Sequence, residues 1–301
     1  MPSYRVGPVH VRVPATSANL GPAFDCAGLA LQLHDDVLVR VDGAGLSVEV
    51  SGEGADRLPR DGRHLVVASL RAAFDRLGGQ PRGLALSCTN RIPQARGLGS
   101  SSAAIVAAVL AARALVDGGE QLLDDDGCLA LATELEGHPD NVAACLLGGL
   151  TLAWTGESGP RVLRLDAAAA LAPVVFVPPG RVSTEQVRAL LPASVPHADA
   201  AASAGRAALL AHAVSRDTSL LLAATEDRLH QDYRAPAMPG TAALVAALRA
   251  DGVPAVVSGA GPSVLALTTA AEREPVAGRA PYGWTVLSLD VAPTGATVLP
   301  A

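Results

Sequence analysis

A glycine- and serine-rich segment at residues 93–104 holds the residue types and spacing that can do chemistry most directly. Gly97 and Gly99 let the backbone curl around an anion without a Cβ in the way. Three serines, Ser100 to Ser102, then open a predicted helix, where unpaired N–H groups and the helix dipole attract phosphate. A serine hydroxyl there can also enter the coordination shell of Mg²⁺. The segment predicts a phosphate-binding loop; the alternative is a turn followed by a helix N-cap.

The types of cationic residue in the chain limit how such a loop can bind phosphate. All 23 of them are arginine, and there is no lysine. That excludes a Walker-A phosphate lysine, a protein-kinase strand lysine and a Schiff-base lysine. Arginine forks, backbone amides and metal ions remain to bind anions. The net charge of −6, without a basic stripe, argues against a nucleic-acid binder.

Cysteine spacing and hydropathy bear on the compartment. No CxxC or Cys/His cluster occurs, which predicts buried free thiols in a reducing compartment for Cys26, Cys88, Cys128 and Cys145. Residues 1–13 lack a basic region followed by an apolar core, and the longest apolar run, residues 105–116, is too short to span a bilayer. We therefore expect a cytoplasmic protein without a membrane segment.

The elements that must position the loop are a strand that runs into it and a helix that leaves it. Apolar alternation predicts strands at residues 10–14, 29–41, 46–50, 84–91, 148–154, 174–178, 254–258 and 264–267. Helical spacing predicts helices at residues 65–77, 101–116, 127–136, 184–191 and 200–225. No regular βαβ repeat is present, which favours the α+β class, and the length allows two lobes.

Three ordered motifs resemble those of the GHMP kinase superfamily, which includes galactokinases, homoserine kinases and mevalonate kinases. Pro93-x-x-x-Gly-Leu-Gly-Ser-Ser-x-Ala103 is similar to the ATP loop, Val-Pro-Ala-Thr-Ser-Ala-Asn-Leu-Gly-Pro-Ala-Phe-Asp at 13–25 to the first motif, and Ser-Gly-Ala-Gly-Pro-Ser at 258–263 to the third. The resemblance implies a two-lobed α+β fold. Residues 1–165 would form an N-terminal, ribosomal-protein-S5-like, ATP-binding lobe and residues 166–301 a ferredoxin-like C-terminal lobe, with the active site in the cleft between them.

Further segments resemble the homoserine kinase branch of this superfamily. They are Glu136-Gly-His-Pro-Asp-Asn-Val142, Ser183-Thr-x-x-x-Arg188 and His230-Gln-x-Tyr-Arg234. By residue type alone, His138 and Asp140 are as readily capping and turn residues, and a single arginine is more often solvated. The resemblance implies ATP-dependent phosphorylation of L-homoserine to O-phospho-L-homoserine, a step of threonine biosynthesis.

The polar groups of an amino-acid alcohol can be matched to residues of these motifs. Asp25 and Asp140 can bind the ammonium, while Arg188 and Arg234 can fork onto the carboxylate. The remaining polar groups would be oriented by Asn19, Asn141 and His138. The resemblance assigns ATP to Pro93, Arg96, Gly97, Leu98, Gly99, Ser100, Ser101, Ser102 and Ala103.

Metal binding and proton transfer complete the expected mechanism. Mg²⁺ is expected on Ser101 and Glu136, with Glu134 as the alternative, because residues two apart on a helix face different ways. In-line phosphoryl transfer needs positioning and charge neutralisation more than covalent help. Related kinases use an aspartate base where Asn141 stands here, which implies no protein general base. Thr184 and Arg188 would hold the hydroxyl and the moving phosphate; Asp140 as a base is the alternative.

Two departures from the family pattern and two rival functions remain. Ala23 stands where glycine is usual, and His64 stands where asparagine is common near the adenine. One rival is a GHMP kinase for another alcohol such as mevalonate, which has no ammonium for Asp25 and Asp140. The other is a non-catalytic relative that binds a small molecule. Relatives are commonly dimers, so a homodimer is expected.

Overall fold

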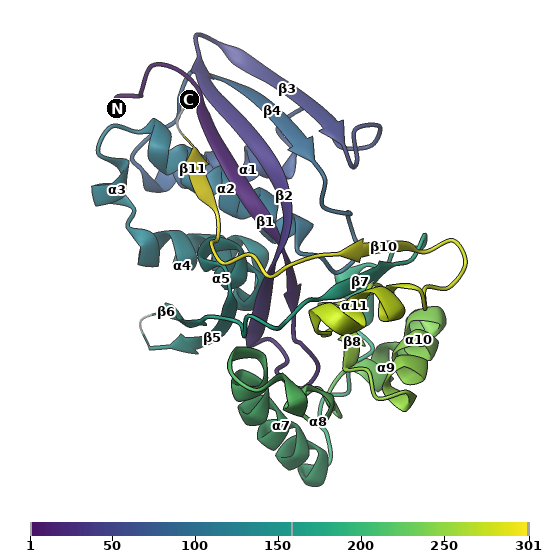
Figure 1. Cartoon of the computed structure of the whole chain (residues 1–301). Coiled ribbons are helices and arrows are strands. Elements are labelled where there is room, and N and C mark those ends of the chain that lie inside the picture. The colour runs from purple at the N-terminus through teal and green to yellow at the C-terminus, as the bar shows by residue number, and fades with distance from the viewer. Residues whose placement is uncertain (1, 158, 300–301) are drawn as a thin grey trace.

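The computed structural model describes residues 2–157 and 159–299, which form two lobes, each built on its own sheet (Figure 1). The larger sheet has the strand order β11-β1-β2-β4-β3, and β5 pairs with both β2 and β6. Its strands are β1 (Val9–Ala18), β2 (Ala27–Asp42), β3 (Gly45–Gly52), β4 (Gly83–Asn90), β5 (Leu150–Gly156), β6 (Gly159–Leu165) and β11 (Thr297–Leu299). Among the described residues, β3–β4 is the one parallel pair of this sheet, and a helix connects these two strands.

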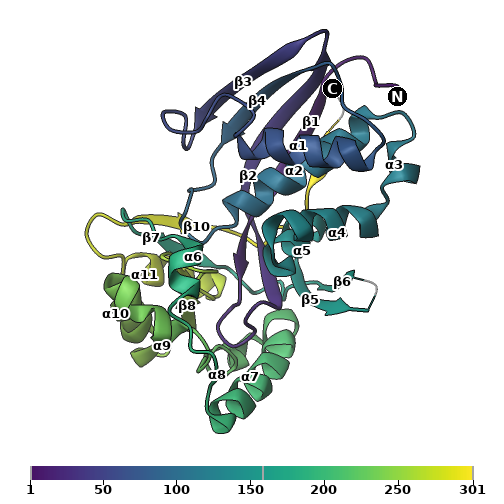
Figure 2. The same ribbon diagram turned by 180° about the vertical axis from the view of Figure 1, so that it is seen from behind.

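Helices cover one face of this sheet (Figure 2). They are α1 (Leu65–Arg76), α2 (Ser100–Leu115), α4 (Asp125–Glu136) and α5 (Pro139–Leu147), with the short α3 (Gly119–Leu122) beside them. The alanines of α2 let its backbone lie close to β1 and to α1, because a methyl group needs little space. Eleven of its residues are buried, including Ile105, Val106 and Val109. The central helix is thereby held rigidly beneath the glycine- and serine-rich segment that precedes it.

The smaller sheet has the order β10-β7-β9-β8, from β10 (Thr285–Ser288), β7 (Val174–Val177), β9 (Val264–Ala266) and β8 (Ala255–Val257). Around it lie α6 (Thr184–Arg188), α7 (His197–Ser215), α8 (Leu221–Ala224), α9 (Gln231–Arg234), α10 (Pro239–Ala250) and α11 (Ala270–Ala277). Val174 and Phe176 pack with Leu244 and Leu248 of α10 in the core of this lobe. After β10 the chain returns to the larger sheet, where β11 pairs with β1 (Figure 1).

The predicted two-lobed α+β fold is confirmed, and every predicted strand and helix has a counterpart. The helix predicted at residues 200–225 is in fact three pieces, because Arg216 leaves the helical conformation and Asp217 caps a 3₁₀ turn at Thr218–Leu220. Several elements were not predicted from the sequence, among them β6, α10, α11, β10, β11, and α5, which begins at Pro139 directly after Gly137 ends α4. The division of the chain into two lobes between residues 165 and 166 stays a proposal. Strand β11 comes after this division in the chain, but it pairs with β1 in the larger sheet.

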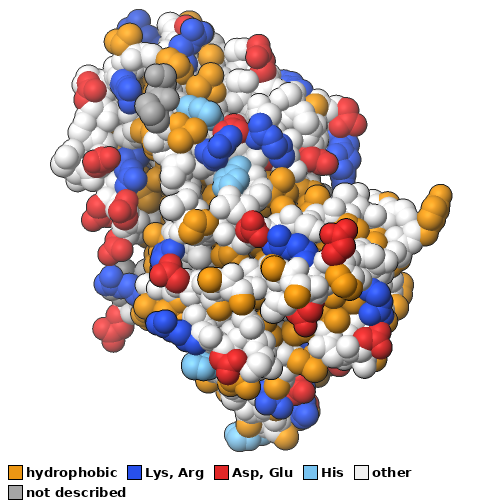
Figure 3. All heavy atoms as spheres, viewed as in Figure 1, with side chains coloured by type: hydrophobic (Ala, Val, Ile, Leu, Met, Phe, Trp, Pro, Cys, Tyr) orange, Lys and Arg blue, Asp and Glu red, His pale blue; other side chains and the backbone are white. Residues whose placement is uncertain are grey.

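The surface and the thiols agree with the composition. On the face seen in Figure 3, basic and acidic side chains are interspersed over the two lobes. All four cysteines are free; three are buried and Cys26 is partly exposed, so the expectation of burial is wrong for that one thiol. Among the helices of the described residues, none combines the length and apolar character needed to cross a membrane.

Candidate active site

A cavity of about 270 Å³ lies between the two lobes, and all three motifs contribute to its walls. The phosphate-loop residues come from the segment before α2, and the arginines come from the smaller lobe. The carboxylates come from the segment between β1 and β2, the end of α4 and the start of α5. Most residues predicted from sequence line it: Asn19, Asp25, Gly97, Leu98, Gly99, Ser100, Ser101, Glu136, His138, Asp140, Asn141, Thr184, Arg188 and Arg234. Residues as far apart in the chain as Asn19 and Ala260 thus meet around one space.

The loop before α2 has a conformation that requires glycine at two positions. Gly97 and Gly99 have φ angles of 73° and 68°, in the left-handed region. A Cβ on Gly99 would collide with the Thr16 hydroxyl, and one on Gly97 would collide with the carbonyl oxygen of Ser258. The Ser258 hydroxyl donates to the Gly97 carbonyl at 2.6 Å. The first and third motifs therefore clamp the loop from two sides.

The N-terminus of α2 opens onto this cavity without a side-chain cap. Gly99 is the N-cap residue, and no side chain accepts a hydrogen bond from the first turn. The N–H groups of Ser100 and Ser101 therefore stand at the positive end of a 16-residue helix beside the cavity. This is the geometry in which helices bind phosphate and other anions.

Two serine hydroxyls converge on one carboxylate at the end of α4. Ser101 Oγ and Ser102 Oγ donate to Glu136 Oε1 at 2.6 and 2.7 Å. Glu134 faces away and accepts a hydrogen bond from Arg76 at 2.7 Å on the outer surface. Of the two carboxylates considered for a metal, only Glu136 lines the cavity. Hard oxygen donors of this kind suit Mg²⁺.

The first turn of α5 presents a fixed group of polar side chains. Asp140 is 2% exposed, and its Oδ1 accepts from the Asn141 N–H at 2.8 Å and lies 2.6 Å from His138 Nδ1. This hydrogen bond raises the pKa of His138. Thr16 Oγ1 donates to Asn141 Oδ1 at 2.7 Å, which fixes the orientation of the Asn141 amide beside the cavity.

An ion pair crosses the cavity from one lobe to the other. Arg188, at the end of α6, donates to both oxygens of Asp25 at 2.8 Å in a bidentate fork. The neighbouring carboxylate raises the pKa of Arg188. The two side chains are 42% and 34% exposed, so solvent reaches the pair. The guanidinium groups of Arg188 and Arg234 also lie 5.5 and 5.2 Å from the centre of the Phe24 ring.

Arg234 is the largest fully buried side chain and has no carboxylate within 4 Å among the described residues. Its Nη1 donates to His230 Nδ1 at 3.2 Å and to the Gly259 carbonyl at 3.4 Å, while its Nε has no partner. Burial, and then the charge of Arg188, lowers the pKa of Arg234. A buried cation without a paired anion is costly, so this group favours an anionic ligand.

The position of His230 beside Arg234 was not predicted from the sequence, where His230 is only a residue of the third homoserine-kinase-like segment. His230 is fully buried, and its Nε2 lies 2.8 Å from the Gly21 carbonyl. If Nε2 carries the proton that it donates there, Nδ1 accepts from Arg234. The four-residue spacing between His230 and Arg234 on one helical turn was the signal that could have revealed this pair.

Some of the residues predicted to bind ATP do not line this cavity. Arg96 donates to the carbonyls of Pro178 and Pro179, at 2.9 and 2.7 Å, and ties the loop to the smaller lobe. Pro93, Ser102 and Ala103 also lie outside the lining of this cavity. Asn19 lines the cavity, but its side-chain amide is hydrogen-bonded to the backbone: Nδ2 donates to Gly259 O, and Oδ1 accepts from Asp25 N.

A second cavity of about 210 Å³ adjoins the first, and Ser100 and Ser101 line both. Its walls are largely apolar, from Val13, Val37, Leu58, Leu65, Val66, Ala103 and Ala104. Its polar side chains include Asp35 and His64. The other departure from the family pattern, Ala23, is 4% exposed and does not have a positive φ, so its methyl group is accommodated.

Comparisons with known proteins agree along the whole chain. Residues 64–149 match the family described as GHMP kinases N terminal domain, and residues 200–283 match GHMP kinases C terminal. The homoserine kinase of Streptomyces avermitilis is 61% identical over 299 residues, which are 99% of this chain and 98% of that protein.

Two solved structures have the same fold. The homoserine kinase of Cytophaga hutchinsonii superposes with a TM-score of 0.83 at 28% identity, covering 97% of each chain. A putative homoserine kinase of Listeria monocytogenes gives a TM-score of 0.79 at 30% identity, covering 97% of this chain and 99% of the other.

Proposed function

This chain belongs to the homoserine kinases of the GHMP kinase family, and we propose that it transfers the γ-phosphoryl group of ATP to the side-chain hydroxyl of L-homoserine. The products are ADP and O-phospho-L-homoserine, an intermediate of threonine biosynthesis. One observation carries the assignment: a single cavity brings an uncapped helix N-terminus together with three carboxylates and two arginines. These are complementary to a polyphosphate and to a zwitterion with an alcohol.

The zwitterion would bind by an exchange of ionic partners. Asp25 gives up Arg188 and binds the ammonium together with Asp140, while Arg188 binds the carboxylate together with Arg234. The exposed ion pair is inexpensive to break, because pairs reached by solvent contribute about 0.2–1 kcal/mol. The unpaired, buried charge of Arg234 supports its role, since a carboxylate would satisfy its Nε. Asn19 would act by holding Asp25 in place, and His138 and Asn141 would orient the substrate.

ATP would place its phosphates at the N-terminus of α2 and its base in the second cavity. The two cavities share Ser100 and Ser101, which supports one continuous nucleotide site. Ser101 and Glu136 would hold Mg²⁺, and their converging oxygens fit a hard cation. Bound there, the metal would neutralise charge on the phosphates. Arg96, Pro93, Ser102 and Ala103 would support the loop.

The transfer would proceed in line and without a protein general base. The homoserine oxygen attacks the γ-phosphorus, the bond to the bridging oxygen of ADP breaks, and the hydroxyl proton passes to a phosphate oxygen. Asn141 cannot accept a proton usefully, and Oδ1 of Asp140 already has two hydrogen-bond partners. Thr184 and Arg188 would hold the hydroxyl and the moving phosphoryl group. The enzyme supplies position and charge, which is what phosphoryl transfer needs.

We further propose that the enzyme is a cytoplasmic homodimer that acts on a small molecule and binds neither nucleic acid nor membrane. Free thiols support a reducing compartment. Trp154 and Leu163, on one face of the β5–β6 hairpin, are 52% and 49% exposed and supply apolar surface for an interface. Light scattering after size-exclusion chromatography tests the mass, and a monomer at micromolar concentration would contradict the dimer.

The decisive experiment measures ADP release with L-homoserine as the only acceptor, in the presence of ATP and Mg²⁺. Mevalonate and galactose serve as matched alcohols without an ammonium. Turnover of either one, but not of L-homoserine, would assign the chain to another alcohol. ATP binding without any acceptor-dependent ADP release would assign it to the non-catalytic relatives.

A further inference from the structure

Asp35 is a buried carboxylate that the proposed mechanism does not use. It lies on β2, is 7% exposed, and lines the second cavity beside the phosphate loop. Burial raises its pKa to about 6, so the group is mostly ionised at neutral pH. A carboxylate kept in such a place needs a partner for each of its oxygens.

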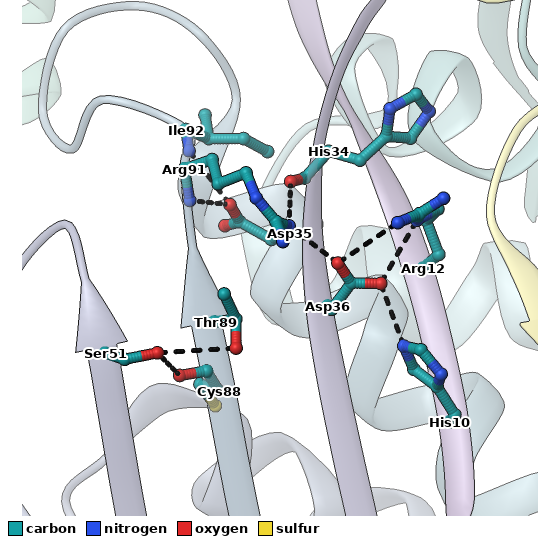
Figure 4. Close-up of polar contacts among 10 residues, drawn as sticks. All are labelled: His10, Arg12, His34, Asp35, Asp36, Ser51, Cys88, Thr89, Arg91 and Ile92. Atoms are coloured by element: carbon teal, nitrogen blue, oxygen red, sulfur yellow. Dashed lines mark hydrogen bonds and ion pairs between the residues drawn. The ribbon is translucent and has the colours of Figure 1, made fainter.

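Only one oxygen of Asp35 has such a partner. Oδ1 accepts from the backbone N–H groups of Arg91 and Ile92, at 2.5 and 2.8 Å, as Figure 4 shows. In the part of the chain that the structure describes, Oδ2 accepts no hydrogen bond. The two amides determine which way the carboxylate lies, because they hold the same oxygen from adjacent residues.

Among the described residues, no cation forms an ion pair with Asp35, because the neighbouring arginines pair with Asp36. Arg91 Nη1 donates to Asp36 Oδ2 at 2.6 Å, and Arg12 and His10 bind Asp36 Oδ1 at 3.1 and 2.8 Å (Figure 4). Successive residues of a strand point to opposite faces of the sheet. Asp36 therefore collects the cations on one face, while Asp35 remains an acceptor beside the cavity on the other.

A second polar side chain in the same wall also lacks a partner. His64 precedes α1, is 3% exposed, and neither ring nitrogen makes a hydrogen bond. Burial, and then the charge of Arg60, lowers its pKa, which keeps the ring neutral. A neutral imidazole offers one donor and one acceptor. The cavity has a largely apolar wall, and its polar lining also includes Asn90, Gln94, Ser100 and Ser101. A carboxylate oxygen and an imidazole without partners, set in such a wall, are suited to a flat ligand with polar edges.

We propose that Asp35 is a specificity-determining residue for the nucleotide: its Oδ2 accepts a hydrogen bond from the 6-amino group of adenine. The inference rests on the proposed nucleotide site, since a base attached to phosphates at α2 would lie in the adjoining cavity. Hypoxanthine carries a carbonyl oxygen in place of that amino group. Two acceptors would then face each other in a buried site, so Asp35 selects ATP over ITP.

Asp35→Asn is the sharpest test, because the structure fixes how the amide must lie. The N–H groups of Arg91 and Ile92 require the amide oxygen at the position of Oδ1, so the NH₂ group takes the position of Oδ2. The cavity then presents a donor, which repels the adenine amino group and binds the hypoxanthine carbonyl. The variant should lose the preference for ATP and gain one for ITP.

Calorimetry with MgATP and MgITP, without homoserine, gives the two dissociation constants without turnover. We expect the wild type to bind ATP about tenfold or more tightly than ITP, and the ratio of the constants to shift at least tenfold in the variant. Asp36→Asn is the matched control, since it removes the adjacent charge on the other face and should leave the ratio unchanged. A merely structural role for Asp35 would weaken both nucleotides equally, and an unchanged ratio in Asp35→Asn overturns the inference.

A second measurement on the wild type does not depend on the variant folding. Purine riboside triphosphate lacks only the 6-amino group and should bind about tenfold more weakly than ATP. Equal binding of the two overturns the role of Asp35. Absence of ATP binding by the wild type would instead refute the proposed nucleotide site itself.

Discussion

The ion pair between Asp25 and Arg188 allows a quantitative test of how the substrate binds. In an exchange, the ammonium replaces Arg188 at Asp25, and the carboxylate of homoserine replaces Asp25 at Arg188. Binding then gains two contacts to charged groups, each worth about 1.5–3 kcal/mol, and loses one solvent-exposed pair worth about 0.2–1 kcal/mol. The perturbations are Asp25→Asn, which tolerates the left-handed φ of 53° at this position, and Arg188→Met, which keeps an apolar stem.

Each single variant loses one charged contact with homoserine, but homoserine no longer has to break the Asp25–Arg188 pair when it binds. The loss in binding free energy is therefore roughly 1–2.5 kcal/mol, or about 5- to 70-fold in the dissociation constant of homoserine. The double variant loses both contacts with homoserine. The cost of breaking the pair is avoided in each single variant, but it is subtracted only one time in the double variant. Its loss should exceed the sum of the single losses by the energy of the pair, about 0.2–1 kcal/mol.

Calorimetric titration of homoserine into the enzyme with a non-hydrolysable ATP analogue and Mg²⁺ measures all four proteins. Two truncated ligands serve as controls. 3-Aminopropan-1-ol lacks the carboxylate, so Arg188→Met should not weaken its binding and should strengthen it by the energy of the broken pair, about 0.2–1 kcal/mol. 4-Hydroxybutyrate lacks the ammonium, and Asp25→Asn should strengthen its binding by the same amount. If the pair stays intact in the complex and acts as one unit, the double variant loses no more than a single variant, and the exchange is refuted.

Three further predictions concern individual carboxylates. Glu136→Gln should weaken Mg²⁺-dependent ATP binding at least about tenfold, whereas Glu134→Gln, whose side chain is paired on the outer surface, should not; equal effects in a titration of Mg²⁺ would contradict the metal assignment. Asp140→Asn should raise the KM for homoserine more than it lowers kcat; a loss confined to the chemical step would make Asp140 a base. The same change should return the pKa of His138 toward its ordinary value in an NMR titration, because that hydrogen bond is the main cause of the raised pKa. For Asp35, the folded-state pKa of about 6 lies above the ordinary 3.8, so ionisation destabilises the fold as pH rises from 4 through 6. Relative to the wild type, the free energy of unfolding of Asp35→Asn should therefore rise by up to about 3 kcal/mol between pH 4 and pH 7, as measured by urea unfolding. A difference between the two proteins that does not change with pH would contradict the assigned pKa.

The conformation of the loop could be predicted from sequence because it is local. Two glycines followed by serines at a helix start can present backbone amides to an anion, because the first-turn amides and the backbone freedom are properties of the segment itself. The order of strands and helices was equally local, since apolar periodicity records which face of an element is buried. The helix α5 was missed because Gly137-His138-Pro139 ends one helix and begins the next within three residues, and turn residues serve both purposes.

Other features required distances between residues far apart in the chain. Glu134 and Glu136 are equivalent by type, and only the packing of α4 places one beside Ser101 and the other beside Arg76. The sequence assigned Asp25 and Arg188 to opposite ends of a substrate, but their pairing across 163 positions depends on how the lobes meet.

By itself, then, the sequence determined the family motifs, the α+β class and the phosphate loop, all of which depend on neighbours within a dozen residues. The tertiary structure decided which side chains share a cavity, which charges are already paired, and which polar atoms are left without a partner. Asp35 is the clearest case: alternation along residues 29–41 places it on the apolar face with Val37 and Val39 and places Asp36 on the other face, but alternation does not show which of their oxygens have partners. Only the folded chain gives one of them two arginines and a histidine as partners and leaves the other with a free oxygen beside a cavity. Burial and hydrogen-bond satisfaction are properties of the packed whole, so they cannot be read from spacing alone.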